Sequence, residues 1–492
     1  MQEDEFKFKT DIIISDEYCK SLESESKSYN INDVPIFISC LSESDPLKKY
    51  KGLFGLRTLL LKEFLNENPK QLYNGDINIL FNIFENYPEK FKIHCLKCII
   101  LIESINFKIE KQIKNEPSEK TIQIMLYILE FHEKMKLELL ILDLEYINLL
   151  YKEYYIDKLA SEKLYNNIKN LLLNKFSIDE KLCQISLMIL ITLIKAKKEF
   201  AKNDKILEII PCLNDIMDKY QSNSKIKTSV LNLLYELTEI NIASDNPIRE
   251  KLINKIIELK ILQKLIDDSD KLDIVEEKMQ LQYSIRTIGN IAAMPEEEYT
   301  DKIIEYNGLD KLKILMQKKY PFEIRKEISW IISNIAAGTN QQLTKLYEKD
   351  FQSILFDVIT NGEENKVKEN CLWALYNYCN INNMEYLDNL VEKGIIDIII
   401  KRLKIDSGDV LCCSLEALNN ILSEGKKRDP ASFNIIESKI NEYDLLNDLK
   451  GLLKNCEEEM LKKKIETILD NYYGIQDFDK FLDLKDEENE KI

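Results

Sequence analysis

Two tryptophans and a row of asparagines are the side chains of this sequence best placed to act together on a ligand. The asparagines lie at positions 290, 334, 377 and 420, so they are 44, 43 and 43 residues apart. The only two tryptophans, Trp330 and Trp373, are also 43 residues apart, and each stands four residues before an asparagine. An indole face attracts a Lys or Arg cation, and a carboxamide offers a hydrogen-bond donor and acceptor together. This pattern predicts binding of an extended, Lys/Arg-rich peptide.

The elements that must position these side chains follow from the same period. A repeat of about 40–47 residues is typical of HEAT or armadillo units. In one unit, turn residues separate a short helix predicted over Gln341–Lys349, a second over Phe351–Thr360 and a longer third over Asn365–Cys379. Three helices per unit favour armadillo over HEAT. Gly308 and Gly394 are 86 residues apart, which is two periods, and both are expected to end helices.

Each tryptophan–asparagine pair lies on a predicted third helix, on the side that the core does not need. At 100° per residue, one stripe of each helix is apolar: Val367, Cys371, Ala374, Leu375 and Tyr378 in one unit, and Ile328, Ile331, Ile332 and Ile335 in the preceding one. Glu327, Trp330 and Asn334 share the opposite face, as do Trp373 and Asn377. An exposed Trp is unusual and indicates a binding surface. Alternatively, each Trp packs on the third helix of the neighbouring unit, and each Asn bridges two helices.

The spacing of stacked helices matches an extended peptide. Helices packed about 8–10 Å apart meet two to three residues of a strand that rises about 3.3 Å per residue. Asparagine amides are suited to the unpaired peptide groups of such a strand. Slots between the tryptophans would hold Lys or Arg stems, with roughly 0.5–2 kcal/mol from each cation over a ring. Glu327 is placed to neutralise a bound cation.

Composition and charge bound the class of protein. The chain has 492 residues but only 12 Gly and 10 Pro, which disfavours sheet-rich folds and low-complexity linkers. Its formal charge is −17, which disfavours nucleic-acid and anionic-membrane partners and favours basic ones. We predict an all-α fold, a right-handed superhelical armadillo solenoid of about ten repeats over 35–474. Acidic segments over 1–34 and 475–492 are predicted to be mostly disordered.

Catalytic and metal-binding signals are weak. The chain has two histidines, His94 and His132, and no phosphate loop or nucleophile elbow. Cys95 and Cys98 form a C-x-x-C pair beside His94, but no second pair follows at zinc spacing, so buried helix residues are the favoured interpretation. The eleven cysteines fit a reducing compartment. We expect no enzyme activity, no cofactor and no metal, and the absence of a secretion signal or a long apolar run predicts an intracellular protein.

The repeat segments resemble importin-alpha, the armadillo adaptor that recognises nuclear localisation signals. Glu327–Gly338 is similar to the family's seventh repeat, Trp373–Asn377 to its eighth and Arg286–Ile291 to its sixth, where the family also has Arg in place of Trp. Leu418–Leu422 resembles the ninth repeat, and Asn441–Gly474 resembles the tenth. The resemblance is strong over about 280–475 and weaker over 35–280.

The resemblance implies a minor-site-like groove in the C-terminal half. The implied peptide-binding residues are Arg286, Asn290, Glu327, Trp330, Asn334, Trp373, Asn377 and Asn420. A family glutamate before the second Trp is replaced by Asn370, with Glu369 adjacent. The implied partners are basic cargo peptides or proteins, importin-beta and the nuclear export receptor, and the implied location is cytoplasm and nucleus.

Two departures from the family affect this interpretation. No Trp precedes Trp330, so a high-affinity major site in the N-terminal half is not expected. Residues 1–34 carry nine acids and four lysines, so the family's basic importin-beta-binding arm is not visible. Either import proceeds without that arm, or the chain works in another assembly, or the arm was lost with a change of role. The alternative function is an armadillo scaffold subunit of a stable complex without general transport activity.

Overall fold

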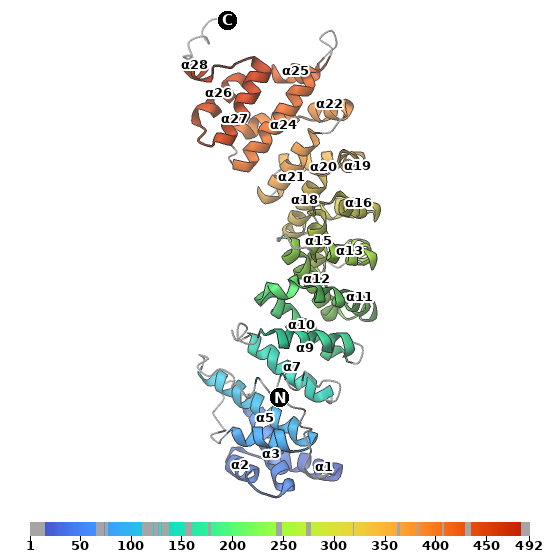
Figure 1. Ribbon diagram of the computed structural model, residues 1–492, viewed down its shortest axis with the longest axis vertical. Helices are drawn as coiled ribbons and strands as arrows, with labels where there is room; N and C mark the ends of the chain where they lie inside the picture. Colours follow the sequence, from blue (N-terminus) through green and yellow to red (C-terminus); the bar gives the residue numbers. More distant parts are fainter. Residues whose placement is uncertain are drawn as a thin grey trace. The chain divides into compact units, whose positions relative to one another are not determined.

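In the computed structural model, every regular element among the described residues is helical. The structure describes residues 15–64, 73, 77–110, 122, 126, 129, 137–152, 160–175, 179–242, 248–271, 277–317, 319–361, 365–380, 383–405, 408–428 and 434–483. The chain divides into two compact units, Met1–Glu236 and Leu237–Ile492, and the boundary lies within helix α12 (Ser224–Ile242). Figure 1 shows the helices in chain order. The prediction of an all-α fold is confirmed.

The described part of the second unit contains five consecutive helix triplets, between the end of α12 and the C-terminal helix α28 (Phe478–Asp483). Their bounds are α13 Ile248–Glu258, α14 Ile261–Ser269 and α15 Lys278–Ala292; α16 Glu297–Glu305, α17 Gly308–Leu315 and α18 Phe322–Ala336; α19 Asn340–Glu348, α20 Phe351–Thr360 and α21 Asn365–Tyr378; α22 Met384–Glu392, α23 Ile395–Leu403 and α24 Gly408–Lys426; and α25 Ile435–Ile440, α26 Leu445–Asn455 and α27 Glu459–Ile468. The three helices predicted for the unit over 341–379 are α19, α20 and α21, so that prediction is confirmed.

The third helices of the triplets pack against one another in series. α15 contacts α18, α18 contacts α21, α21 contacts α24 and α24 contacts α27. The predicted apolar stripes form this core, because Ile328, Ile331, Ile332 and Ile335 of α18 are all fully buried. The stripe of α21 from Val367 to Tyr378 is fully buried as well. Each third helix therefore depends on its neighbours to cover its apolar face.

The junction between the first and second helices repeats a left-handed residue. Lys260, Asn307, Asp350 and Gly394 each have φ between 57° and 95°, immediately before the second helix. The prediction for Gly308 is wrong, since Asn307 holds the left-handed position and Gly308 begins α17. Gly308 is required for a different reason. A Cβ there would lie 2.5 Å from the carbonyl oxygen of Ile303.

Ion pairs connect neighbouring triplets. Lys311 Nζ lies 2.7 Å from Asp270 Oδ1, and Lys349 Nζ lies 2.8 Å from Asp310 Oδ1. Gln342 of α19 adds hydrogen bonds from its Nε2 to Asp301 Oδ1 at 2.8 Å and to the carbonyl oxygen of Glu297 at 2.9 Å. Largely exposed pairs such as Lys349–Asp310 contribute little energy, so their main effect is to fix the register of one triplet on the next.

The first unit also stacks long helices in series. Among its described residues, the α-helices before the boundary helix are α1 Asp16–Glu25, α2 Val34–Leu41, α3 Pro46–Phe64, α4 Asn78–Asn86, α5 Glu89–Glu110, α7 Leu137–Lys152, α9 Glu162–Lys175, α10 Glu180–Ala196 and α11 Ile209–Lys219. α3 contacts α5, α5 contacts α7, and α7 contacts α10. Shorter helices cover these, with α2 on α3, α4 on α5 and α9 on α10.

Both acidic end segments contain more structure than predicted. Within 1–34, α1 buries Leu22 completely and is tied down by ion pairs from Lys51 to Glu25 and from Lys90 to Asp16. Within 475–492, α28 (Phe478–Asp483) contacts α26, and Lys450 Nζ lies 5.5 Å from the centre of the Phe481 ring. The prediction of disorder is therefore wrong for these helices, because a few apolar and paired residues suffice to dock them. Residues 1–14 and 484–492 lie outside the described residues.

The C-x-x-C pair lies in the core of the first unit. Cys95 and Cys98 are fully buried on α5, and burial raises the pKa of the Cys98 thiol to about 12. His94 is buried beside them, with its Nε2 3.0 Å from Tyr50 Oη and its Nδ1 3.3 Å from Arg57 Nη1. Among the described residues, no three His, Cys, Asp or Glu side chains are placed to bind a metal ion.

His94 makes the first unit sensitive to acid. Burial, assisted by the Arg57 charge, lowers the pKa of His94 from 6.5 to about 3. The unfolded chain takes up a proton near pH 6.5 and the folded chain does not, so stability falls as the pH drops from 6.5 toward 3. Between pH 7 and pH 5 this linkage costs about 2 kcal/mol. We expect hydrogen exchange of α5 to show that loss in the natural chain and not in His94→Gln; equal losses in both would contradict it.

Candidate peptide-binding site

The eight predicted binding residues all lie on four stacked third helices of the second unit. α15 carries Arg286 and Asn290; α18 carries Glu327, Trp330 and Asn334; α21 carries Trp373 and Asn377; and α24 carries Asn420. Because these helices pack in series, the eight residues lie on consecutive helices that contact one another. We call this set the tryptophan–asparagine row.

Both tryptophans of the row are partly exposed, and Trp330 is also a packing residue. A Cβ on Gly289 of α15 would lie 2.6 Å from Cζ3 and 3.0 Å from Cε3 of Trp330. One edge of the indole therefore rests against the bare backbone of the neighbouring third helix. The two alternatives for this Trp are compatible, since the ring packs along one edge and exposes part of its surface.

The four asparagines differ in what they offer a ligand. Asn290 is only 3% exposed, and its Nδ2 donates to Thr238 Oγ1 at 3.0 Å, so it bridges α15 to α12. Asn420 donates from Nδ2 to Oδ1 of Asn380. Asn377 is partly exposed. Asn334 is also partly exposed, but its buried Nδ2 has no hydrogen-bond acceptor. An unsatisfied buried donor costs about 1–3 kcal/mol, which makes Asn334 the asparagine with most to gain from a ligand.

The charged residues of the row are paired with each other. Arg286 donates to Oε1 of Glu327 from Nε at 3.2 Å and from Nη2 at 3.1 Å, and Lys326 Nζ lies 3.3 Å from the same oxygen. Glu327 is 7% exposed. Its Oε1 atom therefore already contacts two cations, so a ligand cation would share the carboxylate with Arg286 and Lys326 or displace one of them.

The substituted position Asn370 has a structural role. Its Nδ2 donates to Ser329 Oγ at 3.0 Å and to the carbonyl oxygen of Lys326 at 3.2 Å, so it joins α21 to α18. The adjacent Glu369 forms an ion pair with Lys366 at 3.1 Å. The Asn370 amide and the Glu369 carboxylate would each have to give up these contacts before either could take the place of the family's glutamate.

Two neighbours of the row were missed by the sequence analysis. Gly289 carried a usable signal, because a glycine inside a helix costs about 1 kcal/mol relative to Ala and indicates a close approach. Asn380 lies one turn beyond Asn377 and carried no comparable signal. Its significance depends on α24, which brings Asn420 against it.

Comparisons with known proteins agree with a repeat fold. No protein-family model matches the sequence. The probable importin subunit alpha-A of Dictyostelium discoideum is 27% identical over 154 residues, which is 31% of this chain and 26% of that protein. The match thus spans about a quarter of the length of that relative. The crystal structure of an engineered protein matches 90% of this chain and 99% of its own, with a TM-score of 0.63 and 16% identity.

Two designed armadillo repeat proteins match a smaller part. One, solved in complex with the peptide (KR)4, covers 54% of this chain with a TM-score of 0.43 and 27% identity. Another, designed for modular peptide recognition, covers 54% with a TM-score of 0.44 and 25% identity. The fold assignment does not depend on these lower scores. Three-helix triplets at a period near 43 residues, with third helices stacked in series, define this chain as an armadillo-repeat protein.

No helix of the described part is both long and apolar enough to cross a membrane.

Gly289 should control the position of the Trp330 indole. We expect Gly289→Ala to displace the ring or to destabilise the second unit by about 1–3 kcal/mol, because the new methyl overlaps the indole. In a Trp373→Phe background, Trp330 is the only indole, so its emission maximum reports the displacement. Gly451→Ala is the matched control, since nothing lies within 4 Å of a Cβ there. Unchanged emission and stability in Gly289→Ala would refute the contact.

Proposed function

We propose that this protein is a nuclear import adaptor that binds Lys/Arg-rich nuclear localisation signals in extended form along the tryptophan–asparagine row. The observation that carries the proposal is the pair of partly exposed indoles on the stacked helices α18 and α21, with the unsatisfied Nδ2 of Asn334 on α18 four residues after Trp330. The partial identity to a probable importin subunit alpha supports the same function. Cytoplasm and nucleus are the corresponding proposed locations.

The indoles and Asn334 contribute distinct interactions with such a peptide. The apolar stem of a Lys or Arg lies along an indole, and its charge is attracted to the ring face. A small rotation of Asn334 presents its Nδ2 to a peptide carbonyl oxygen, which removes the cost of the unsatisfied donor. The formal charge of −17 attracts basic peptides over long distance, so association should weaken as salt rises.

The partners of transport belong to the same proposal. Importin-beta and the nuclear export receptor are proposed on the family resemblance. In the described part of 1–34, the acidic residues Asp16 and Glu25 are already engaged by lysines of the first unit.

Removing both indoles tests the proposed function. We expect Trp330→Ala with Trp373→Ala to weaken binding of a lysine-rich peptide by about 1–4 kcal/mol, roughly 5- to 1,000-fold in Kd, because two cation–indole contacts are lost. Fluorescence anisotropy of the labelled peptide measures the change. Tyr306→Ala, a partly exposed aromatic outside the row, is the control and should bind as the natural chain does. Unchanged affinity in the double variant would overturn the groove assignment.

The Arg286–Glu327 pair predicts a gain of affinity on mutation. Arg286 competes with a ligand cation for the Glu327 carboxylate, so we expect Arg286→Ala to tighten basic-peptide binding by about 0.5–1 kcal/mol, roughly two- to fivefold in Kd. Lys278→Ala is the matched control, because it removes one cation from the same helix α15 and from a different ion pair, with Glu323. Equal gains in the two variants would show a general charge effect and contradict direct competition.

A scaffold subunit of a stable complex is the second candidate function. It is favoured by the packing of Trp330 on Gly289 and by the burial of Asn290, which give parts of the row a role between repeats. A scaffold should copurify with one stoichiometric partner and should not bind isolated basic peptides. Purification of the full chain from its own cells, followed by the same anisotropy titration, separates the two functions.

A further inference from the structure

A cavity of about 370 Å³ lies between the C-terminal end of α24 and the π-helical turn η5 (Leu469–Tyr473), which directly follows α27. Its polar lining residues are Asn419, Ser423, Lys426, Lys427, Asn471 and Tyr472. Two of these side chains are cations, and none of the described residues that line the cavity carries a carboxylate. We call it the lysine cavity.

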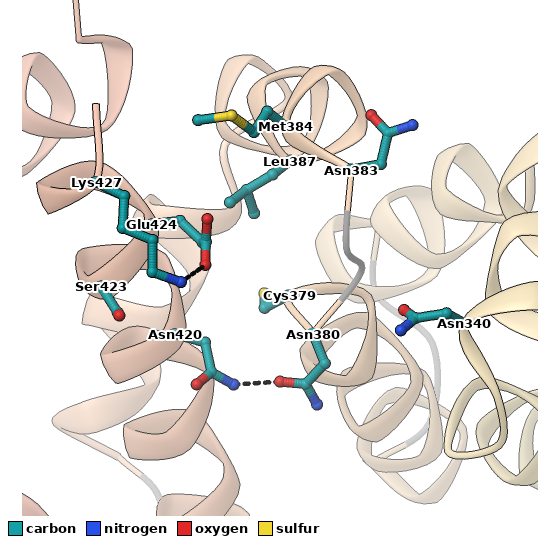
Figure 2. A pocket seen from close by; sticks show the side chains of 10 residues that line it. All are labelled: Asn340, Cys379, Asn380, Asn383, Met384, Leu387, Asn420, Ser423, Glu424 and Lys427. Carbon is teal, nitrogen blue, oxygen red and sulfur yellow. Dashed lines mark hydrogen bonds and ion pairs between the residues drawn. The ribbon is translucent and has the colours of Figure 1, made fainter. Parts of the chain in front are cut away.

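The lysine cavity adjoins the end of the tryptophan–asparagine row. A second cavity, of about 350 Å³, lies between α21, α24 and the start of α22 and is the one drawn in Figure 2. Asn420 of the row lines this second cavity, which shares Ser423 and Lys427 with the lysine cavity. A peptide that follows the row from Trp373 to Asn420 and continues past α24 therefore reaches the lysine cavity.

Lys426 is held in place by groups that do not neutralise its charge. Its Nζ donates to the carbonyl oxygen of Asn471 and lies 5.3 Å from the centre of the Tyr472 ring. Both of these partners belong to η5, and both are uncharged. An ammonium group has three N–H donors, so one bond leaves two donors on a cation that no carboxylate of the described residues pairs with.

Lys427 can supply a second cation at little cost. It forms an ion pair with Glu424, three residues earlier on α24, and its own side chain is largely exposed. Exposed pairs of this kind are weak, because water and salt screen them. Figure 2 shows this pair, and Glu424 lines the second cavity but not the lysine cavity. Rotation of Lys427 toward an anion would therefore give up little.

An anionic oxygen group complements these donors better than peptide backbone or a basic side chain does. Ammonium groups only donate hydrogen bonds, so they need a ligand that accepts. A peptide backbone brings one N–H donor for every C=O, and a ligand Lys or Arg would bring a third cation. Ionised carboxylate and phosphate oxygens only accept, and their charge strengthens each hydrogen bond.

We propose that the lysine cavity is a subsite for an anionic side chain of the bound peptide, phosphoserine or Asp/Glu, on one side of its basic stretch. The proposal rests on the proposed function and extends it from a basic ligand to a basic ligand with an acidic flank. The cavity lies about one and a half helix spacings from Trp373, or about 12–15 Å. An extended peptide covers this distance in about four residues.

The test compares peptides that share a lysine-rich core. The core is extended at one end or the other, through a Gly-Ser-Gly spacer, by phosphoserine, Ser, Glu or Gln, and Kd is measured by anisotropy with the full chain. At one end we expect phosphoserine to bind about three- to tenfold more tightly than Ser, and Glu about two- to fivefold more tightly than Gln. At the other end both anions should weaken binding, because the chain is acidic overall. A gain for one anion alone identifies it as the ligand, and gains for both identify anionic side chains in general.

A charge-removing variant locates the gain. Lys426→Met keeps an unbranched apolar stem and removes the cation, so we expect it to abolish the gain and to leave the Kd of the unextended core within about twofold. Lys454→Met is the matched control, because it removes an exposed lysine of α26 that does not line the cavity, and it should keep the gain.

The outcomes keep the two proposals distinct. If the core binds but neither anion tightens binding at either end, the subsite is overturned and the import function stands. The same conclusion follows if the gain survives Lys426→Met or is lost equally in Lys454→Met. If the core itself does not bind, the proposed function fails and the subsite fails with it.

Discussion

The structure of the second unit depends on one constraint: each third helix must bury its apolar stripe against the third helices of its neighbours. The stripes of α18 and α21 are fully buried, and α15, α18, α21 and α24 are in contact in series. A single triplet cannot cover this surface by itself, so burial of apolar area drives the stacking. The faces of the third helices outside these buried stripes repeat at the distance between neighbouring helices. The tryptophan–asparagine row lies on these faces.

Packing and binding share the same side chains in this row. Trp330 rests on Gly289, Asn290 bridges to Thr238, and Glu327 is neutralised by Arg286 and Lys326. Several polar and charged groups that a ligand would meet on this surface therefore already have partners within the protein. Its affinity should come from the groups still available, above all the indole faces and the amide of Asn334. Two cations, Arg286 and Lys326, contact the single carboxylate of Glu327 at this end of the row, so the position of a basic peptide depends on these ion pairs as well as on new contacts.

Much of the fold followed from the sequence because the repeat imposes the same local demands every 43 residues or so. The helices over 341–379 were predictable from turn residues and helical period, and the buried stripes from the spacing of Ile, Val, Cys and Ala. Gly308 shows the limit of this reasoning. Its distance from Gly394 matched two periods, but the left-handed position is one residue earlier, at Asn307, and Gly308 is needed for its contact with Ile303. The docking of α1 was also not predictable, because it depends on lysines of α3 and α5 that are distant in the chain.

The sequence by itself determined that the chain is a repeat of three-helix units and that two indoles and four carboxamides occupy equivalent positions. The spacing of apolar residues is visible in the sequence itself. It indicates where helices form and which face of each helix is buried. Only the tertiary structure decided what each carboxamide can do, because a hydrogen-bond partner is set by a neighbouring helix. Asn290 donates a hydrogen bond to Thr238, and Asn420 donates one to Asn380. Asn334 has a buried amide donor without an acceptor. Four residues that are identical in sequence therefore differ in chemistry, since each meets a different surface of the preceding or following repeat.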